Sequence, residues 1–131
     1  MIRVLVVDDD PIILRLLQLN LELEGHEVET AADGREALDR VNALEPDLIL
    51  LDVMMPEIDG FRVCEELRSH DRTRDIPVVF LSAKAQASDI ERGTAVGGDA
   101  YVTKPFDPQE LVELIERLVA DRRATTSGEG G

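Results

Sequence analysis

Residues 2–11, Ile-Arg-Val-Leu-Val-Val-Asp-Asp-Asp-Pro, decide the fold of this chain. Their first six residues are mostly β-branched and apolar, which is typical of a buried strand, and three aspartates close the run. Pro11 fits the first turn of a helix, and leucine and isoleucine recur at helical spacing until Gly25, where a helix is expected to end. The stretch therefore predicts a strand that leads directly into a helix.

The same alternation repeats along the chain and predicts an α/β fold. The expected strands are 2–7, 27–31, 47–51, 77–81 and 100–103, and the expected helices are 12–23, 37–44, 61–67, 88–96 and 108–118. Because right-handed crossovers carry each helix back over a parallel sheet, five strands and five helices predict an open, doubly wound, flavodoxin-like sheet with strand order 2-1-3-4-5. Gly93 interrupts the fourth helix, which we expect to be the most mobile.

The length and composition indicate one globular domain. The chain has 131 residues, of which 44% are hydrophobic and 32% charged, a mixture that can fill a core and remain in solution. We expect the domain to span residues 1–121 and residues 122–131 to form a flexible tail or linker stub. The 28 acidic and 14 basic side chains leave a net charge of −14, which disfavours direct binding to nucleic acid.

Several residue types indicate where the protein works. Cys64 is the only cysteine, so we expect a buried thiol and a reducing, cytoplasmic location. The apolar run at the N-terminus is too short for a signal peptide, and no apolar stretch approaches 18 residues, so no membrane insertion is expected. His26 and His70 fall at helix-end or connecting positions and are expected to face solvent.

Polar residues follow four of the expected strands. Asp8 and Asp9 come after the first strand, Asp52 after the third, Ser82 after the fourth and Lys104 after the fifth. The carboxyl ends of parallel strands meet at one edge of the sheet, so these side chains are expected to converge there. Three gathered carboxylates repel one another unless a cation joins them, and their oxygens suit Mg²⁺.

This set of groups favours phosphoryl transfer. An aspartate carboxylate can form an acyl phosphate, which makes Asp52 the candidate nucleophile, while Mg²⁺, Lys104 and Ser82 would stabilise negative charge on the phosphoryl group. Each residue also has a structural interpretation on its own: Asp10 is suited to capping the first helix, and Glu57 and Asp59 read as solvated loop acids.

Four segments together resemble the receiver domain of two-component response regulators, including the stand-alone chemotaxis regulators. These segments are Val6-Val7-Asp8-Asp9-Asp10-Pro11, Leu51-Asp52-Val53-Met54-Met55-Pro56 with Asp59-Gly60, Leu81-Ser82-Ala83, and Tyr101-Val102-Thr103-Lys104-Pro105-Phe106. They occur in the family's order between about residues 2 and 121.

The resemblance implies a phosphorelay switch. Asp52 would accept a phosphoryl group from a phosphohistidine on a sensor histidine kinase or phosphotransfer protein. Asp9, Asp52 and the backbone carbonyl of Met54 would ligate Mg²⁺, with Asp8 acting through a bound water. Lys104 would pair with the phosphoryl oxygens. The chain would catalyse its own phosphorylation and dephosphorylation, and serve mainly as a signalling switch.

The resemblance also implies an output surface. Ser82 would move toward the phosphoryl group, and Tyr101 would turn inward and remodel the face made by the fourth helix, fifth strand and fifth helix. Positions that form charged pairs in the winged-helix regulators hold Ile90, Ala100 and Leu114 here, so those pairs cannot form. The apolar set could dock a partner or be covered by its neighbours. Any effect on DNA is expected to pass through a partner or another domain.

Three other functions remain open at this point. A flavodoxin-like cofactor carrier is disfavoured because three aspartates stand where a phosphate-binding loop is needed. An aspartate phosphatase would use Asp8 as nucleophile and Asp10 as general acid, and would leave Asp52 without a role. A scaffold that keeps the receiver fold without being phosphorylated is the third.

Overall fold

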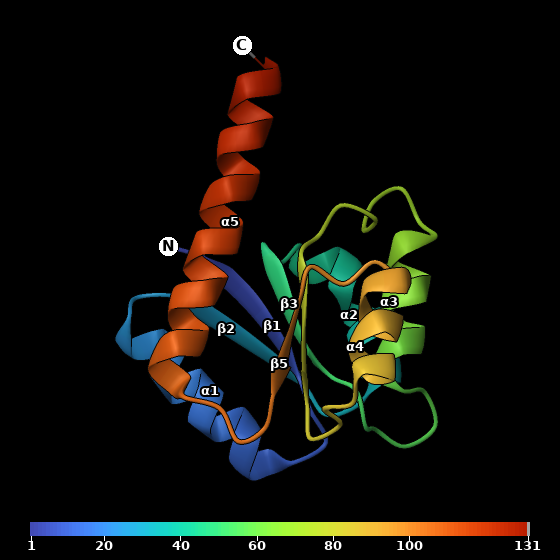
Figure 1. Cartoon of the computed structure of the whole chain (residues 1–131). Helices are drawn as coiled ribbons and strands as arrows, with labels where there is room; N and C mark the ends of the chain where they lie inside the picture. The colour runs from blue at the N-terminus through green and yellow to red at the C-terminus, as the bar shows by residue number, and fades with distance from the viewer. Residues whose placement is uncertain (131) are drawn as a thin grey trace.

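A parallel sheet of five strands, in the order β2-β1-β3-β4-β5, forms the centre of the molecule (Figure 1). The computed structural model describes the backbone of residues 1–130 and the side chains of residues 1–124. The strands are β1 (Arg3–Val7), β2 (Glu27–Ala31), β3 (Leu48–Asp52), β4 (Val78–Ser82) and β5 (Ala100–Thr103), and the helices are α1 (Pro11–Leu23), α2 (Gly34–Leu44), α3 (Gly60–Arg68), α4 (Ala87–Ala95) and α5 (Pro108–Gly130). The predicted fold class and strand order are confirmed, and the strand boundaries differ from the expected ones by a residue at most.

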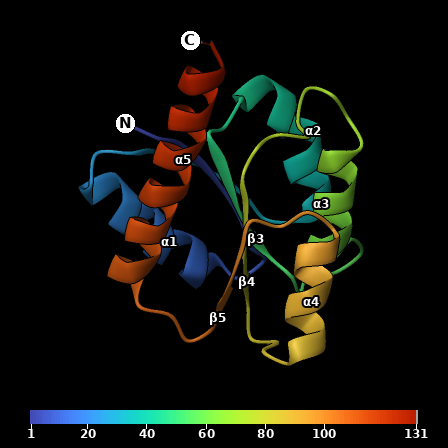
Figure 2. The same ribbon diagram turned by 45° about the horizontal axis from the view of Figure 1, so that its top comes forward.

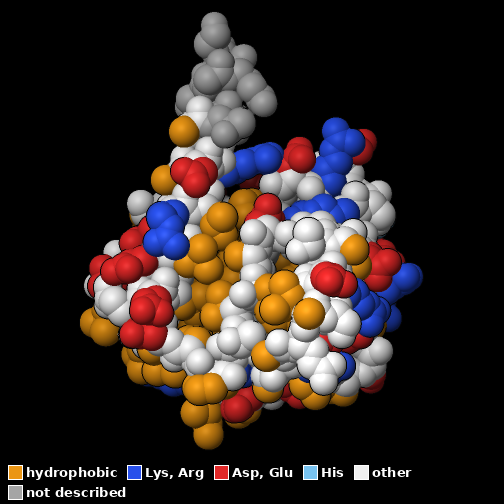
Figure 3. All heavy atoms as spheres, viewed as in Figure 1, with side chains coloured by type: hydrophobic (Ala, Val, Ile, Leu, Met, Phe, Trp, Pro, Cys, Tyr) orange, Lys and Arg blue, Asp and Glu red, His pale blue; other side chains and the backbone are white. Residues whose placement is uncertain are grey.

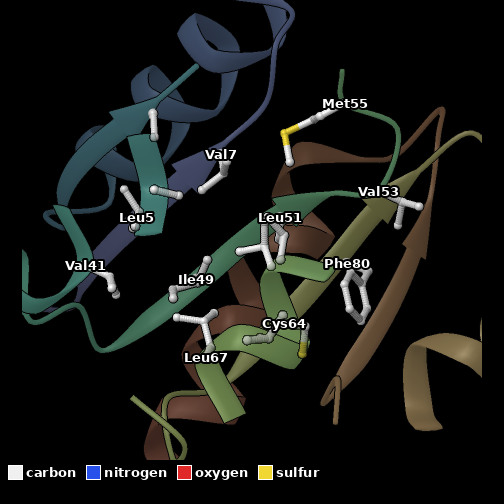
Figure 4. Close-up of a cluster of buried hydrophobic side chains, with 14 of the residues drawn as sticks. Leu5, Val7, Val41, Ile49, Leu51, Val53, Met55, Cys64, Leu67 and Phe80 are labelled. Atoms are coloured by element: carbon white, nitrogen blue, oxygen red, sulfur yellow. The ribbon is translucent and has the colours of Figure 1, made fainter. Parts of the chain in front are cut away.

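Helices cover both faces of the sheet. Helices α1 and α5 lie on one face, and α2, α3 and α4 lie on the other (Figures 1 and 2). Successive side chains of a strand point to opposite faces, so Val4 and Val6 pack toward α1 and α5, while Leu5 and Val7 pack toward α2 and α3. Figure 4 shows this second cluster, in which Cys64 is fully buried as expected. No helix in the described part of the chain is long and apolar enough to cross a membrane.

Aspartates are the N-cap residues of α1, α2 and α3. The carboxylates of Asp10, Asp33 and Asp59 accept hydrogen bonds from the backbone N–H groups of Ile12, Glu36 and Arg62, at 2.8–2.9 Å. Each bond satisfies an N–H that has no partner within the helix. The capping role considered for Asp10 is confirmed. Asp59 lies in the loop before α3 and is partly exposed, and in addition it is the N-cap of that helix, a role that the sequence interpretation did not include.

Helix α5 is longer than the sequence pattern predicts. It continues to Gly130 instead of ending near Leu118. Arg122 and Arg123 lie 3.6 and 3.4 Å from carboxylates of Asp75 and Asp47, so these two arginines contact the domain. The side chains of residues 125–130 and all of residue 131 lie outside the described residues, and the division near residue 121 stays a prediction.

The two histidines have different environments. His26 was expected to face solvent, but its side chain is only 8% exposed. Its Nδ1 accepts a hydrogen bond from the Ile2 N–H at 3.2 Å, and its Nε2 lies 2.8 Å from a carboxylate oxygen of Glu116 in α5. His26 therefore joins the start of β1 to α5. The side chain of His70 is 70% exposed, as expected.

Candidate functional site

Three carboxylates meet at the carboxyl edge of the sheet. Asp8 and Asp9 follow β1, and Asp52 is the last residue of the neighbouring strand β3. One carboxylate oxygen from each of them lies within 4.8 Å of the others. Asp8 and Asp52 are buried, with 1% and 4% exposed, whereas Asp9 is exposed. The structure thus brings together the three acids that the sequence analysis assigned to one metal site.

Lys104 supplies positive charge to this cluster from the loop after β5. Its Nζ lies 3.2 Å from Asp8 Oδ2 and 3.6 Å from Asp52 Oδ1. Burial by itself would lower the pKa of Lys104, but the charges of Asp52 and Asp8 outweigh it and raise the pKa. Lys104 is therefore a permanent cation beside both buried carboxylates.

The carboxyl of Asp52 is less acidic than an ordinary aspartate. Burial raises its pKa from 3.8 to about 6, the charge of Asp8 adds to the increase, and Lys104 opposes it. At neutral pH most of Asp52 is ionised, so it can act as a nucleophile. The positive charge of Lys104 does not fully offset the effects of burial and of the Asp8 charge on this carboxylate. A divalent cation bound by oxygen ligands would supply what Lys104 alone does not.

The loop between β3 and α3 holds backbone groups beside Asp52. The Met54 N–H lies 3.3 Å from Asp52 Oδ1 and donates to it, and the Gly60 N–H donates to the Val53 carbonyl at 2.9 Å. A side chain at position 60 would collide with the carbonyl oxygen of Asp52, so glycine permits the start of α3 to pack against the end of β3. This packing places Met54 at the rim of the carboxylate cluster.

Ser82 and Tyr101 are linked through the backbone of Lys84. Ser82 is fully buried, and its Oγ accepts a hydrogen bond from the Lys84 N–H at 3.0 Å. The Tyr101 hydroxyl donates to the Lys84 carbonyl at 2.7 Å. The Tyr101 ring is partly buried and lies 6.0 Å from the ring of Phe80 between centroids. The two predicted switch residues are therefore coupled to one segment, the loop between β4 and α4.

Gly93, which weakened the prediction for the fourth helix, has a packing role. It is the buried residue of α4, and a Cβ there would lie 3.0 Å from the ring of Tyr101 and 3.2 Å from that of Phe80. Glycine therefore lets α4 approach β4 and β5 closely. The expected mobility of this helix stays a prediction.

Arg92 is a site residue that the sequence analysis missed. A pocket of about 400 Å³ opens beside Asp9, and Met54, Lys84 and Arg92 are among the residues that line it. The Arg92 guanidinium lies 4.7 Å from the centre of the Phe61 ring, in the geometry of a cation–π contact. Arg92 belongs to no sequence motif, so no local signal marks it, whereas Lys84 stands out as one of two lysines.

The face made by α4, β5 and α5 exposes one of the three apolar residues considered above. Ile90 is 40% exposed on α4. Ala100 and Leu114 are partly buried and pack against the core beneath α1 and α5. Figure 3 views this side, where hydrophobic side chains fill the space between α5 and β5. Ala100 and Leu114 are thus only partly covered by their own neighbours.

Asp10, the general acid of the phosphatase alternative, has a structural role in this fold. The Asp10 carboxylate is exposed and caps α1, and the Asp10 backbone N–H donates to Asp8 Oδ1 at 2.9 Å. The other oxygen of Asp8 receives the bond from Lys104. These contacts are those of a buried charged pair beside Asp52, and they place Asp10 in a structural role.

Comparisons with known proteins agree with this architecture. Residues 4–116 match the family model of the response regulator receiver domain. The chemotaxis protein CheY4 of Vibrio cholerae has a TM-score of 0.85 and 36% identity, over 89% of this chain and 98% of that one. A CheY-like receiver domain protein from Methanospirillum hungatei has a TM-score of 0.89 and 29% identity, over 95% of this chain and 98% of that one.

Curated relatives are longer proteins. The chain is 45% identical over 117 residues to the DNA-binding dual master transcriptional regulator RpaA of Synechocystis, and 47% identical over 117 residues to the alkaline phosphatase synthesis transcriptional regulatory protein PhoP of Bacillus subtilis. In both cases the match covers 89% of this chain and 48% of the relative. The chain therefore spans about half the length of these relatives.

Proposed function

The chain belongs to the receiver domain family of two-component response regulators, and on this premise we propose that it is a phosphorylation switch whose phosphoacceptor is Asp52. The observation that carries the proposal is the grouping of Asp8, Asp9 and Asp52 within 4.8 Å, with Lys104 at 3.2 and 3.6 Å from two of them.

Asp52 would act as the nucleophile toward a phosphohistidine. Its carboxylate oxygen attacks phosphorus and forms the P–O bond of an acyl phosphate, while the P–N bond to the donor imidazole breaks. The electron pair of that bond stays on the imidazole nitrogen, which takes a proton from solvent. A pKa of about 6 supports this role, because it leaves most of Asp52 ionised at neutral pH.

The acidic cluster fits a magnesium ion, which receiver domains use in such a pocket. Asp9, Asp52 and the Met54 carbonyl would hold the ion directly and Asp8 mainly through a water, since Mg²⁺ keeps several waters in protein sites. The donor set supports this fit: three carboxylates lie together, two of them buried, with one lysine between them. When bound, Mg²⁺ supplies positive charge close to the phosphoryl oxygens.

Lys104 would pair with the phosphoryl group once Asp52 is phosphorylated. Phosphorylation converts the Asp52 carboxylate into an acyl phosphate, which is a mixed anhydride, and places the negative charge on the phosphoryl oxygens. The Lys104 ammonium, which is shared between Asp8 and Asp52, can then pair with one of those oxygens over a short distance. Autophosphorylation from small donors and hydrolysis of the acyl phosphate would use the same groups.

Ser82 and Tyr101 would transmit the change to the surface. If Ser82 turns to donate its hydroxyl to the phosphoryl group, it gives up its bond from the Lys84 N–H, and the β4–α4 loop can shift. The Tyr101 hydroxyl bonds to the carbonyl of the same lysine, so a shift of the loop releases the ring to turn inward. The face of α4, β5 and α5 would then carry the output.

The partners follow from these two surfaces. A sensor histidine kinase or a histidine phosphotransfer protein would supply the phosphoryl group, and a downstream protein or an output domain would read the switched face. RpaA is DNA-binding, and the chain matches about half of it, so control of DNA would come from a segment outside the receiver. The net charge of −14 supports this division.

Mass spectrometry after incubation with acetyl phosphate and Mg²⁺ tests the phosphoacceptor. We expect one added phosphoryl mass, labile to acid and base, in the wild-type protein and none in Asp52→Asn. Glu57→Gln, which removes an exposed loop acid, is the matched control and should gain the same mass as the wild type. A gain of equal size in Asp52→Asn would place the phosphoryl group on another residue, and no gain in the wild type would favour the unphosphorylated scaffold function.

Amide NMR spectra with beryllofluoride, a phosphoryl mimic, test the switch. We expect the largest shifts at residues 82–104, which include Ser82, the β4–α4 loop, α4 and β5. Shifts confined to the carboxylate cluster and its loops, with residues 88–102 unmoved, would contradict the output surface while leaving the phosphoacceptor intact.

A further inference from the structure

Helices α2 and α3, which lie side by side on one face of the sheet (Figure 2), border a groove that is distant from the carboxylate cluster. A hollow of about 440 Å³ lies at the C-terminal end of α3, whereas Asp52 packs against the N-terminal end of that helix. A second hollow of about 280 Å³ adjoins the first and shares Val41, Arg72 and Thr73 with it. The two form one groove, here called the α2–α3 groove, whose lining includes Arg35, Leu38, Val41, Leu67, Arg72 and Thr73.

The floor of the α2–α3 groove is mainly apolar. Val41 and Leu67 are buried, and Leu38 is partly buried beside them. The hydroxyl of Thr73 is already satisfied, because it donates to the Leu67 carbonyl at 2.6 Å. A hollow of this size with an apolar floor favours a ligand that buries an apolar group in it.

Two acidic residues on the rim of the groove are already paired with arginines that do not line it. A carboxylate oxygen of Glu66 lies 2.9 Å from the guanidinium of Arg62. A carboxylate oxygen of Asp71 lies 3.3 Å from the guanidinium of Arg74. The charges of these two acids are therefore largely offset from outside the groove.

The arginines on the rim lack such close partners. Among the described side chains, Arg35 has no ion-pair partner. Arg72 has a carboxylate oxygen of Glu45 at 3.9 Å, beyond hydrogen-bond distance, and these two side chains are 70% and 74% exposed. The net charge of −14 makes most of the surface repel an acidic ligand, which favours binding at places where cations are uncompensated. The groove thus combines an apolar floor with two cations that can pair with a ligand.

The spacing of the two cations fits an extended peptide. Arg72 lies beside Val41, which follows Arg35 by six residues, so the cations are about 9 Å apart along the α2 axis. In an extended segment, residues i, i+2 and i+4 face the same side and span about 13 Å. Acidic side chains at i and i+4 can reach both arginines, whose side chains are long, and the side chain at i+2 then faces the floor.

We propose that the α2–α3 groove binds an extended segment of a partner protein that carries acidic residues at i and i+4 and a large aliphatic residue at i+2. The acidic side chains pair with Arg35 and Arg72, and the aliphatic side chain packs on Leu38, Val41 and Leu67. Exposed ion pairs are weak and the buried area is small, so we expect a dissociation constant on the order of 0.1–1 mM for the segment alone.

Amide NMR titration of the full chain with the peptide acetyl-Asp-Ala-Leu-Ala-Asp-amide tests the proposal. We expect saturable shifts that are largest at residues 35–45 and 66–76. A peptide with both aspartates changed to asparagine, and one with the leucine changed to serine, should each bind at least about fivefold more weakly. No saturable shift up to about 10 mM peptide, shifts centred on other residues, or equal binding of the asparagine peptide would overturn the proposal.

Two variants test the arginines of the rim. Arg35→Gln and Arg72→Gln should each weaken binding of the acidic peptide at least about threefold, because each removes one ion pair. Arg15→Gln is the matched control: it removes an exposed arginine of α1, on the other face of the sheet, and should leave binding unchanged. Circular dichroism confirms that each variant is folded. Equal loss in the Arg15 variant, or no loss in the other two, contradicts the assignment.

Other occupants of the groove would give different results. If 4-methylpentanoate causes the same shifts at the same or lower concentration, the groove takes a small organic anion and the peptide proposal is overturned. If sedimentation equilibrium without peptide shows a dimer that both Arg35→Gln and Arg72→Gln dissociate, a second copy occupies it. Phosphorylation of Asp52 by acetyl phosphate is measured in the same variants and should be unchanged, so failure of this proposal is distinct from failure of the phosphoacceptor assignment.

Discussion

The ammonium group of Lys104 lies 3.2 Å from the carboxylate of Asp8, although 96 residues separate them in the chain. Asp8 follows β1 and Lys104 follows β5, with β3 and β4 between those strands in the sheet. The long lysine side chain crosses this distance and reaches Asp52, on the strand between, at 3.6 Å. One cation therefore stabilises two buried carboxylates, and the expected effects of several substitutions follow from this arrangement.

Removal of the lysine charge should make Asp52 a weaker acid. In Lys104→Met we expect the pKa of Asp52 to rise above its value of about 6, because burial and the charge of Asp8 then act without opposition. Phosphorylation by acetyl phosphate should slow at least tenfold. Carbon-13 NMR titration of the Asp52 carboxyl measures the pKa. Arg74→Met is the control, since it removes an exposed cation that pairs with Asp71 in the loop before β4. An unchanged pKa in Lys104→Met would contradict the finding.

Neutralisation of Asp52 should stabilise the metal-free protein. The folded-state pKa of about 6 lies above the ordinary 3.8, so the folded protein holds this proton more tightly than the unfolded chain does. The contribution of protonated Asp52 to the free energy of unfolding is fully present below about pH 4 and is lost as the pH rises through about 6. At pH 7 the ionised, buried carboxylate therefore lowers the free energy of unfolding by about 2–3 kcal/mol.

Urea unfolding of Asp52→Asn between pH 4 and pH 7.5 measures this effect. We expect the variant to be more stable than the wild type at pH 7.5 and the difference to shrink toward pH 4. Glu57→Gln supplies the baseline for the loss of an exposed acid. A difference that is constant across the range would show that Asp52 does not titrate near pH 6.

Magnesium should stabilise the fold through the carboxylate cluster. With a dissociation constant of about 1 mM, 10 mM Mg²⁺ adds about 1.4 kcal/mol, which for a domain of this size is a rise of about 3–6 °C in melting temperature. Asp9→Asn should abolish most of the rise, and because Asp9 is exposed the variant should fold normally. Differential scanning calorimetry measures the shift. An equal shift in the Asp9 variant would remove it from the ligand set.

The two histidines should respond differently to truncation. His26→Ala leaves the Ile2 N–H and the Glu116 carboxylate without their partner and opens a gap between β1 and α5, so we expect a loss of about 1–3 kcal/mol in unfolding free energy. His70→Ala, at a side chain that is 70% exposed, should change stability by less than about 0.5 kcal/mol. Equal effects in urea unfolding would contradict the structural role of His26.

Local patterns were sufficient to predict the fold and the grouping of Asp8, Asp9, Asp52 and Lys104 at one edge of the sheet. Each strand is a short apolar run, and each aspartate, serine or lysine stands where such a run ends, so the chain topology alone brings these residues to one edge. The sequence also marked Tyr101, and Asp10 as the residue that caps α1. These features are encoded within a few residues and do not depend on distant contacts.

Other features depend on segments that are far apart in the chain. His26 reads as a polar residue after a helix, and its burial results from contacts with Ile2 and with Glu116, 90 residues away. From the sequence, Asp59 is interpreted as a loop acid. Its N-cap role depends on the packing of Gly60 against the end of β3, where α3 begins. Arg92 lines the pocket beside Asp9, and its guanidinium lies over the ring of Phe61, which belongs to another helix.

By itself, the sequence determined the doubly wound sheet, the order of its strands and the set of acids and one lysine at their ends, because periodicity and strand ends are local properties of the chain. Only the tertiary structure decided that Lys104 is shared between Asp8 and Asp52, and that burial and the charge of Asp8 raise the pKa of Asp52. It also decided which side of α1 is buried. All three depend on distances between strands and helices that are far apart in sequence, since burial and Coulomb energy are set by the neighbours in space.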